Sequence, residues 1–119
     1  MARANDTICL LPQIETMESV RNLNEILGVE GIGGIFIGPG DLSADLKCPG
    51  QFENPELIHL VCESIRRARE RGLHAGVYAS EGKLFEAALN AGADLCIISS
   101  DIKDLIDTWR GQLARCAKK

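Results

Sequence analysis

The sequence predicts an α/β fold in which four successive strand–helix units build a parallel sheet. Short apolar runs alternate with longer segments in which apolar residues recur at helical spacing. Glycines stand where three of the helical patterns end, at Gly28, Gly72 and Gly92. Because strands and helices alternate along the chain, we expect the strands to run parallel, with right-handed crossovers between them.

The first unit occupies the amino-terminal quarter of the chain. A strand is expected over residues 7–14, where the sequence is largely apolar. Thr16 then has the character of a helix cap, and the helix is expected to continue to about Leu27. Val20 and Leu23 share one face of that helix with Leu27, which predicts a face turned toward the sheet.

The second unit begins with a strand expected over residues 34–37. A glycine- and proline-containing loop follows at 38–40, and then a short helical turn over 42–46. Asn54 and Pro55 mark the start of a long helix, because proline at the first helical position lacks only an amide that would be unpaired anyway. Apolar residues at helical spacing predict its buried stripe, namely Leu57, Val61, Ile65 and Ala68.

The third and fourth units complete the pattern. Strands are expected over residues 73–79 and 95–99. Ser80 is the expected cap of the helix after the third strand, and Asp101 is the expected cap of the last helix. In that last helix, three large apolar residues align on one face and predict a contact with a neighbouring helix or subunit: Leu105, Trp109 and Leu113.

The length of 119 residues predicts a single domain, 1–119, that holds all four units. Four units leave two strand edges and one apolar face of the sheet uncovered, which is an aggregation hazard. A closed (β/α)8 barrel needs about 200 residues or more. We therefore expect a partial-barrel domain, a fragment or half of a larger enzyme, completed by a complementary half-barrel or by homo-oligomer formation.

The composition is that of an ordinary soluble domain and argues against several classes of partner. Hydrophobic residues make up 45% of the chain and charged residues 25%. A formal net charge of −4 without a dense basic stripe argues against nucleic-acid binding. No apolar run reaches membrane-spanning length, so no membrane partner and a cytoplasmic location are expected. The five cysteines form no Cys-x-x-Cys pair, which predicts reduced thiols and no zinc site.

Two acidic residues follow the first two expected strands. Glu15 comes directly after the first apolar run, and Asp41 follows the second run and the loop at 38–40. The carboxyl ends of neighbouring parallel strands lie at the same face of a sheet. Two carboxylates at that face can share a divalent cation, which prefers oxygen ligands. The sequence therefore predicts a metal site formed by Glu15 and Asp41.

Each candidate residue also has a purely structural alternative. Glu15 could support the start of the helix that follows it, and Asp41 could cap the short turn over 42–46. Ser43 could supply a local hydroxyl at the start of that turn. Tyr78 and Ser80, at the end of the third strand, are further candidates to line a pocket on the same face.

A longer set of motifs resembles a known family. The motifs are Gln13-Ile14-Glu15-Thr16, Asn22, Gly31, the run Gly-Ile-Phe-Ile-Gly-Pro-Gly-Asp-Leu-Ser over residues 34–43, and Gly50-Gln51. With 26 positions separating the two acids, they resemble the second half of the HpcH/HpaI aldolases. These are metal-dependent (class II) 2-keto-3-deoxy-sugar-acid aldolases of the phosphoenolpyruvate/pyruvate barrel superfamily. The resemblance implies that the four strands are the fifth to eighth of a TIM (β/α)8 barrel.

The resemblance also implies a reaction, the cleavage of 4-hydroxy-2-oxo acids to pyruvate and an aldehyde. Glu15 and Asp41 match the family's ligands for a divalent cation, such as Mg²⁺, Mn²⁺ or Co²⁺. Such a cation would act as a Lewis acid on the charge that develops in the enolate. Gln13 matches a substrate-contacting glutamine, and the residues that match the site for the pyruvate carboxylate are Gly38, Pro39, Gly40 and Ser43.

The family's catalytic base and its enolate-stabilising arginine belong to the first half of the barrel, so the catalytic residues stay unknown here. His59 is expected on an outer helix face and His74 at the amino-terminal end of a strand, so neither is expected to be the base. Gly33 and Ser99 depart from the family pattern. Two alternatives stay open: an oxaloacetate-type decarboxylase, and a truncated non-catalytic module that binds a metal or a 2-oxo acid.

Overall fold

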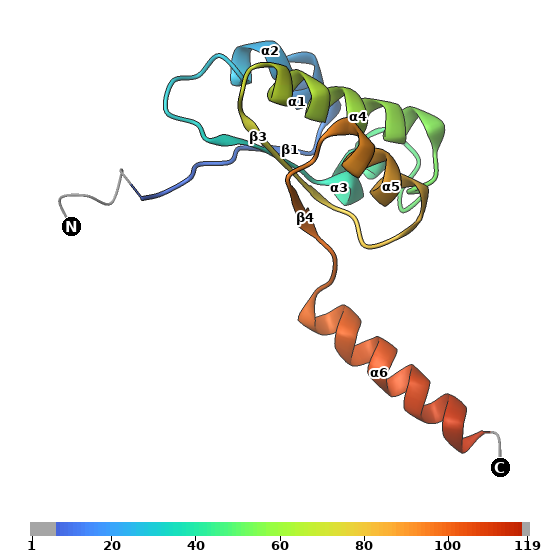
Figure 1. Cartoon of the computed structure of the whole chain (residues 1–119). Helices are drawn as coiled ribbons and strands as arrows, with labels where there is room; N and C mark the ends of the chain where they lie inside the picture. The colour runs from blue at the N-terminus through green and yellow to red at the C-terminus, as the bar shows by residue number, and fades with distance from the viewer. Residues whose placement is uncertain (1–6, 118–119) are drawn as a thin grey trace.

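The computed structural model describes residues 7–117, which form a four-stranded parallel sheet with most of the helices on one face (Figure 1). The strands are β1 (Gln13–Ile14), β2 (Gly34–Ile37), β3 (His74–Tyr78) and β4 (Leu95–Ile97). They lie side by side in chain order, β1-β2-β3-β4, and every neighbouring pair is parallel. The α/β fold with a parallel sheet is therefore confirmed.

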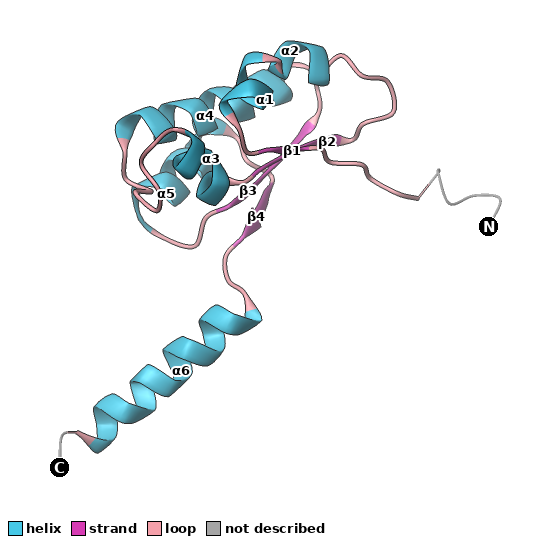
Figure 2. Cartoon of the chain, turned by 180° about the vertical axis from the view of Figure 1, so that it is seen from behind, coloured by secondary structure: helices cyan, strands magenta, loops and turns pink. Residues whose placement is uncertain are grey.

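Six helices alternate with these strands among the described residues, and Figure 2 shows them from behind. They are α1 (Met17–Arg21), α2 (Leu23–Ile26), α3 (Pro39–Asp45), α4 (Pro55–Glu70), α5 (Gly82–Ala91) and α6 (Asp101–Cys116). The single helix expected after Thr16 is instead two short ones, because Asn22 ends α1 and begins α2. Asparagine favours such end positions, since its short polar side chain competes with the helical backbone.

Several helix ends follow the sequence prediction. The Thr16 hydroxyl accepts a hydrogen bond from the Ser19 amide, and the Asn54 side chain accepts from the first turn of α4. Gly72, with φ of +73°, lies just after α4, and Gly92, with φ of +100°, caps α5. Glycine accepts this left-handed conformation without the steric cost that a side chain imposes.

Two expected caps were wrong by one residue. Helix α5 has Glu81 as its cap in place of Ser80, and no side chain caps it. Helix α6 is capped by Ser100, whose hydroxyl accepts from the Lys103 amide, so Asp101 is the first helical residue. The Asp101 carboxylate still accepts a hydrogen bond from the Ile102 amide. Neighbouring serine and acidic residues are alternative caps of similar quality, which the sequence alone does not rank.

The second strand has the expected bounds, 34–37, whereas the other three are shorter than expected, most of all the first. The ladder of β1 holds only Gln13 and Ile14, although a strand was expected from residue 7. Single backbone bonds continue before it, from Gly33 to the Leu10 carbonyl and from Phe36 to the Pro12 carbonyl. The third and fourth strands cover 74–78 and 95–97, against expectations of 73–79 and 95–99.

The core lies between the sheet and the helices that cover it. The side chains of β2 and β3 on this face are fully buried, and they meet the buried stripe of α4. That stripe was expected from the helical spacing, and its members are Leu57, Val61, Ile65 and Ala68. Burial of apolar surface between these two layers is the main favourable contribution to folding.

The opposite face of the sheet carries no helix among the described residues (Figure 2). Leu95 and Ile97 project from β4 on this face and are 44% and 42% exposed. Phe36 lies beside them, against Gly76 of β3. An uncovered apolar sheet face is the feature expected of part of a barrel, in which further strands would enclose it.

Helix α6 extends away from the rest of the molecule (Figure 1). The apolar residues expected to face a neighbour lie on it, yet none of its residues is buried, and Trp109 is 60% exposed. The radius of gyration is accordingly 17.0 Å, whereas a compact chain of this length has about 14 Å. Within residues 7–117, none of the helices combines the length and apolar character needed to cross a membrane.

A charged cluster joins β3 and β4 at their amino-terminal ends. The Asp94 carboxylate lies 2.6 Å from both the Arg69 guanidinium and His74 Nδ1, and it accepts a hydrogen bond from the Ala75 amide. Burial raises the pKa of Asp94, but these hydrogen bonds and the positive charge of Arg69 outweigh it. The pKa of Asp94 therefore lies below its ordinary value of 3.8.

We expect this cluster to stabilise the fold until the solution becomes acidic. A lowered folded-state pKa gives stability that is present above the unfolded-state pKa and is lost as the pH falls through the folded-state value. Asp94→Asn should lower the free energy of unfolding near neutral pH by about 1 kcal/mol, because exposure to solvent screens the charges. Urea unfolding from about pH 6 to about pH 3 should show the two proteins converging in acid. A constant difference would contradict this role for Asp94.

Candidate metal-binding site

The register of β1 and β2 brings the segments with the two predicted acids together. Ile14 and Ile37 are partners across the strands, and the Gly38 amide donates to the Ile14 carbonyl at 3.0 Å. Glu15 and Gly38 are thus the next residues of each strand at the carboxyl end of the sheet. Helix α3 begins directly after Gly38 and carries Asp41 in its first turn. Both acids therefore lie at the same edge, as expected.

Glu15 is held by its neighbour two positions earlier. The side-chain amide of Gln13 donates a hydrogen bond to Glu15 Oε2 at 2.7 Å. Glu15 itself is half-buried, and Thr16 caps the following helix, so the capping alternative for Glu15 was wrong. The Gln13 amide keeps a second N–H and its carbonyl oxygen for other partners. Contact between Gln13 and a substrate stays a prediction.

Asp41 does not cap the helix that carries it, so the structural alternative considered for Asp41 was also wrong. The cap of α3 is Gly38, so the helix begins three residues before the expected turn over 42–46, and Asp41 is the third helical residue. Asp41 is exposed, and its carboxylate has no hydrogen-bond or ion-pair partner within residues 7–117. An acid in the first turn is favourable to the helix dipole, but this leaves both of its oxygens open to a ligand.

Gly38 makes room for the pair Gln13–Glu15. A β-carbon at position 38 would lie 2.8 Å from Gln13 Nε2, 3.2 Å from Glu15 Cβ and 3.3 Å from Glu15 Oε2. These separations are shorter than ordinary van der Waals contacts, so a side chain there would displace the carboxylate. At Gly40, by contrast, nothing lies within 4 Å of the corresponding position.

This difference gives a matched pair of variants. Gly38→Ala should weaken Mn²⁺ binding by about tenfold or more, the effect expected when a metal ligand loses its support. Gly40→Ala should leave binding close to that of the wild type, because its methyl group enters open space. Calorimetric titration with Mn²⁺ measures both. Equal affinities for the two variants would show that the position of Glu15 does not matter for the cation.

Pro39 and Ser43 are buried within the start of α3. The Ser43 hydroxyl donates to the Gly40 carbonyl at 2.6 Å and accepts from the Gly50 amide at 3.0 Å. The local role considered for Ser43 is thus the one that its contacts show, and these contacts hold the following loop against α3. A direct contact of Ser43 with a substrate stays a prediction that its burial disfavours.

The donor set of the site is small. Within residues 7–117 there is no group of three or more His, Cys, Asp or Glu side chains that could hold a metal ion. Glu15 and Asp41 offer two carboxylates at one sheet edge. A hard divalent cation such as Mg²⁺ often binds proteins through one or two carboxylates and keeps its other positions for water or substrate. The pair therefore fits such an ion.

A cavity of about 370 Å³ opens at the same end of the sheet. Tyr78 and Ser80 both line it, as their position at the end of β3 predicted. Because Val77 pairs with Ile37, Tyr78 lies in the same row as Gly38. Phe52 and Lys103 also line the cavity. No local sequence pattern indicated these two residues, since Phe52 comes from a long loop and Lys103 from α6.

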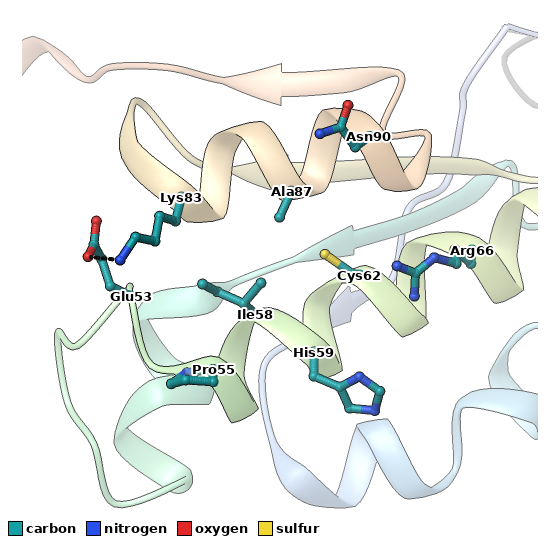
Figure 3. Close-up of a pocket in the computed structure, with 9 residues that line it drawn as sticks. All are labelled: Glu53, Pro55, Ile58, His59, Cys62, Arg66, Lys83, Ala87 and Asn90. Atoms are coloured by element: carbon teal, nitrogen blue, oxygen red, sulfur yellow. Dashed lines mark ion pairs between the residues drawn. The ribbon is translucent and has the colours of Figure 1, made fainter.

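A larger hollow of about 570 Å³ lies between α4 and α5, on the helix side of the molecule (Figure 3). His59 and Arg66 line it, and an ion pair of 3.1 Å joins Lys83 to Glu53 at one end. Cys62 also borders it, and burial raises the pKa of that thiol. None of the residues that line this hollow belongs to a strand, and neither Glu15 nor Asp41 is among them, so its size does not make it the candidate site.

The remaining residues singled out from the sequence lie away from the two acids. His59 faces the outer hollow, and His74 lies at the amino-terminal end of β3, as expected. Gly33 precedes β2 at that same end, where a side chain would overlap with the Cys9 sulfur. The Ser99 hydroxyl donates to Asp104 at the start of α6. Gly33 is thus packed closely against Cys9, and Ser99 has a side-chain partner in the first turn of α6.

Comparison with known protein families establishes the family of this chain. The model of the family described as HpcH/HpaI aldolase/citrate lyase matches residues 1–108. The chain belongs to this family. The resemblance inferred from the motifs around Glu15 and Asp41 is therefore confirmed.

Curated relatives of this HpcH/HpaI family member include 2-keto-3-deoxy-L-rhamnonate aldolases of Escherichia coli strains such as K12. They are 44% identical over 114 residues, which is 96% of this chain but 43% of the relatives. The chain thus spans less than half of their length.

Solved structures agree in fold. An HpcH/HpaI aldolase from Desulfitobacterium hafniense DCB-2 is 29% identical, with a TM-score of 0.81 over 97% of this chain and 44% of that one. The citrate synthase SbnG has a TM-score of 0.87 at 24% identity, over 99% of this chain and 48% of its own. At that identity the likeness to SbnG concerns the fold alone. Together they confirm that the parallel sheet is part of a TIM-barrel-like architecture.

Proposed function

We propose that this chain provides the cation-binding and 2-oxo-acid-binding part of a divalent-metal-dependent aldolase that cleaves 4-hydroxy-2-oxo acids to pyruvate and an aldehyde. The observation that carries the proposal is the placement of Glu15 against Gly38, beside the first turn of the helix that bears Asp41. Membership of the aldolase/citrate lyase family and 44% identity to sugar-acid aldolases support the same class of reaction.

The donor chemistry supports Mg²⁺, Mn²⁺ or Co²⁺ as the cation. Both acids supply hard oxygen ligands, and Asp41 is without a competing partner among the described residues. Glu15 keeps one oxygen outside its bond to Gln13. When bound, the cation would supply Lewis-acid stabilisation of the negative charge that develops on the 2-oxo acid during cleavage.

The other residues of the site would hold and orient the reacting acid. The Gln13 amide fixes the direction of the Glu15 carboxylate, and its remaining polar atoms lie on the face of the sheet without helices. The backbone from Gly38 to Gly40 lies at the same edge, where a side chain at position 38 would block the approach. We propose that this backbone borders the pyruvate end of the substrate.

A complete reaction needs groups that residues 7–117 do not bring to the site. Both histidines lie elsewhere, one on the outer helix face and one at the opposite end of the sheet. The bare apolar face with Leu95 and Ile97 also requires a cover. We propose that a complementary half-barrel, or a second copy of the chain, supplies both. Without it, the chain would be a binding module for a metal and a 2-oxo acid.

The first test measures binding by the 119-residue chain itself. Calorimetric titration with Mn²⁺ is carried out alone and with pyruvate or oxalate present. We expect saturable binding of one ion, strengthened by either acid, because the acid occupies coordination positions that the two carboxylates leave open. A folded chain that binds no Mn²⁺ under either condition would contradict the proposal.

The second test concerns the reaction. The chain is combined with the amino-terminal half of a relative, and pyruvate release from 2-keto-3-deoxy-L-rhamnonate is followed, since relatives carry that name. Aldolase activity predicts an aldehyde in equal amount. Release of pyruvate from oxaloacetate, with carbon dioxide as the other product, would favour the decarboxylase alternative. Mn²⁺ binding without activity on either acid would favour the non-catalytic module.

A further inference from the structure

A hydrogen bond joins two elements of the candidate site that are far apart in sequence. The Met17 amide donates to Asp45 Oδ2 at 2.7 Å, across 28 positions of the chain. Met17 is the first residue of α1, and Asp45 is the last residue of α3. A charged acceptor makes such a bond about twice as strong as a neutral one.

The bond connects the two segments that carry the acids. Met17 follows Glu15 by two residues, and Asp45 lies one helical turn beyond Asp41 on the same side of α3. The capping pair Thr16 and Ser19 satisfies other amides of α1 and leaves the Met17 amide to Asp45. The start of α1 is therefore held from within its own turn and also from α3.

Helix α3 is anchored in the core more firmly than helix α1, so we expect the bond to restrain α1. Helix α3 is fixed by Leu42 and Ser43, which are both fully buried. Helix α1 is five residues long and buries none of them completely. An isolated helix of that length is not stable by itself. The hydrogen bond to Asp45 thus ties the residues that follow Glu15 to α3, which is fixed in the core.

We propose that Asp45 is a positioning residue, which sets the separation of Glu15 and Asp41 without touching the cation or the substrate. The expected effect of Asp45 on metal affinity rests on the proposed function. Its structural part, the restraint of residues 15–19 by Asp45, stands independently. The sequence offered only a weak signal, namely an acid four positions after Asp41.

The test compares the wild type with Asp45→Ala, Asp45→Asn and a control, Asn54→Ala. The control removes hydrogen bonds to the first amides of α4, so it also costs stability but spares the two acids. Asp45→Ala should weaken Mn²⁺ binding by about tenfold, and Asn54→Ala should not. Asp45→Asn keeps an oxygen acceptor and should recover most of the affinity. The electron paramagnetic resonance spectrum of bound Mn²⁺ should change only in Asp45→Ala.

Amide hydrogen exchange gives a second readout that needs no metal. Asp45→Ala should speed exchange over residues 15–19 at least tenfold, while Asn54→Ala leaves that segment unchanged. Unchanged exchange in Asp45→Ala, or wild-type Mn²⁺ affinity in that variant, would overturn the inference. If the wild type binds no Mn²⁺, the proposed function fails, and the exchange data still decide whether Asp45 restrains the segment.

Discussion

Replacing Gly34 by alanine is expected to destabilise the sheet more than a glycine-to-alanine change at any other position. A β-carbon at this position would overlap with the carbonyl oxygen of His74 and lie 2.6 Å from its carbonyl carbon. These are backbone atoms of β3, the strand paired with Gly34 in register, so no side chain can turn aside. Gly34→Ala should therefore lower the free energy of unfolding by about 3 kcal/mol or more, the upper range for overpacking.

Urea unfolding followed by circular dichroism measures this loss, and Gly111→Ala is the control. Gly111 lies in α6 with nothing within 4 Å of the added carbon, so alanine there should stabilise the helix slightly. Wild-type stability in Gly34→Ala would mean that β2 and β3 do not approach as closely as the register requires.

Removing the charge of either acid is expected to abolish measurable cation binding. Glu15→Gln and Asp41→Asn keep the shape of each side chain but replace an anionic oxygen ligand by a weak neutral one. With these two carboxylates as the proposed protein ligands, each change should raise the Mn²⁺ dissociation constant by about a hundredfold or more, which exceeds the effect of losing a residue that only supports a ligand. Either change should lower the free energy of unfolding by no more than about 1 kcal/mol, because neither acid is a helix cap and Asp41 contributes only through the helix dipole.

Two further variants make this result specific. Glu18→Gln changes an exposed acid in the first turn of α1, three residues from Glu15, and should bind Mn²⁺ as the wild type does. The double variant of Glu15 and Asp41 should bind no worse than either single variant, since ligands of one ion act as a unit. Additive losses, or a loss in Glu18→Gln, would indicate general electrostatic attraction in place of a defined site.

The parts of the fold that local chemistry governs were predictable from the sequence. Apolar spacing placed α4 and its buried stripe, and alternation of strands with helices predicted a parallel sheet. Gly72 and Gly92 were recognised as helix ends because their left-handed backbone is favourable only for glycine. Motif and spacing also predicted that Glu15 and Asp41 lie at one edge of the sheet, since both follow strands that end there.

Contacts between distant segments were not predictable in the same way. No local pattern indicates that Gly34 meets the backbone of His74, or that Gly38 lies under the Gln13–Glu15 pair. The bond between Met17 and Asp45 also depends on how α3 is placed on the sheet. The helix α6 and the apolar face along it were predicted. An amphipathic pattern shows which face of a helix is apolar, but it does not show which element or partner packs against that face.

The strand order of the sheet has a consequence for how the chain folds. Since β1, β2, β3 and β4 are neighbours in the same order as they occur along the chain, each new strand pairs with the one made just before it. Every pairing closes only the loop of a single crossover, so the entropic cost of each step is that of one such loop. The sheet can therefore grow by addition at one edge during synthesis, from the amino terminus onward, with no gap left for a later strand to enter.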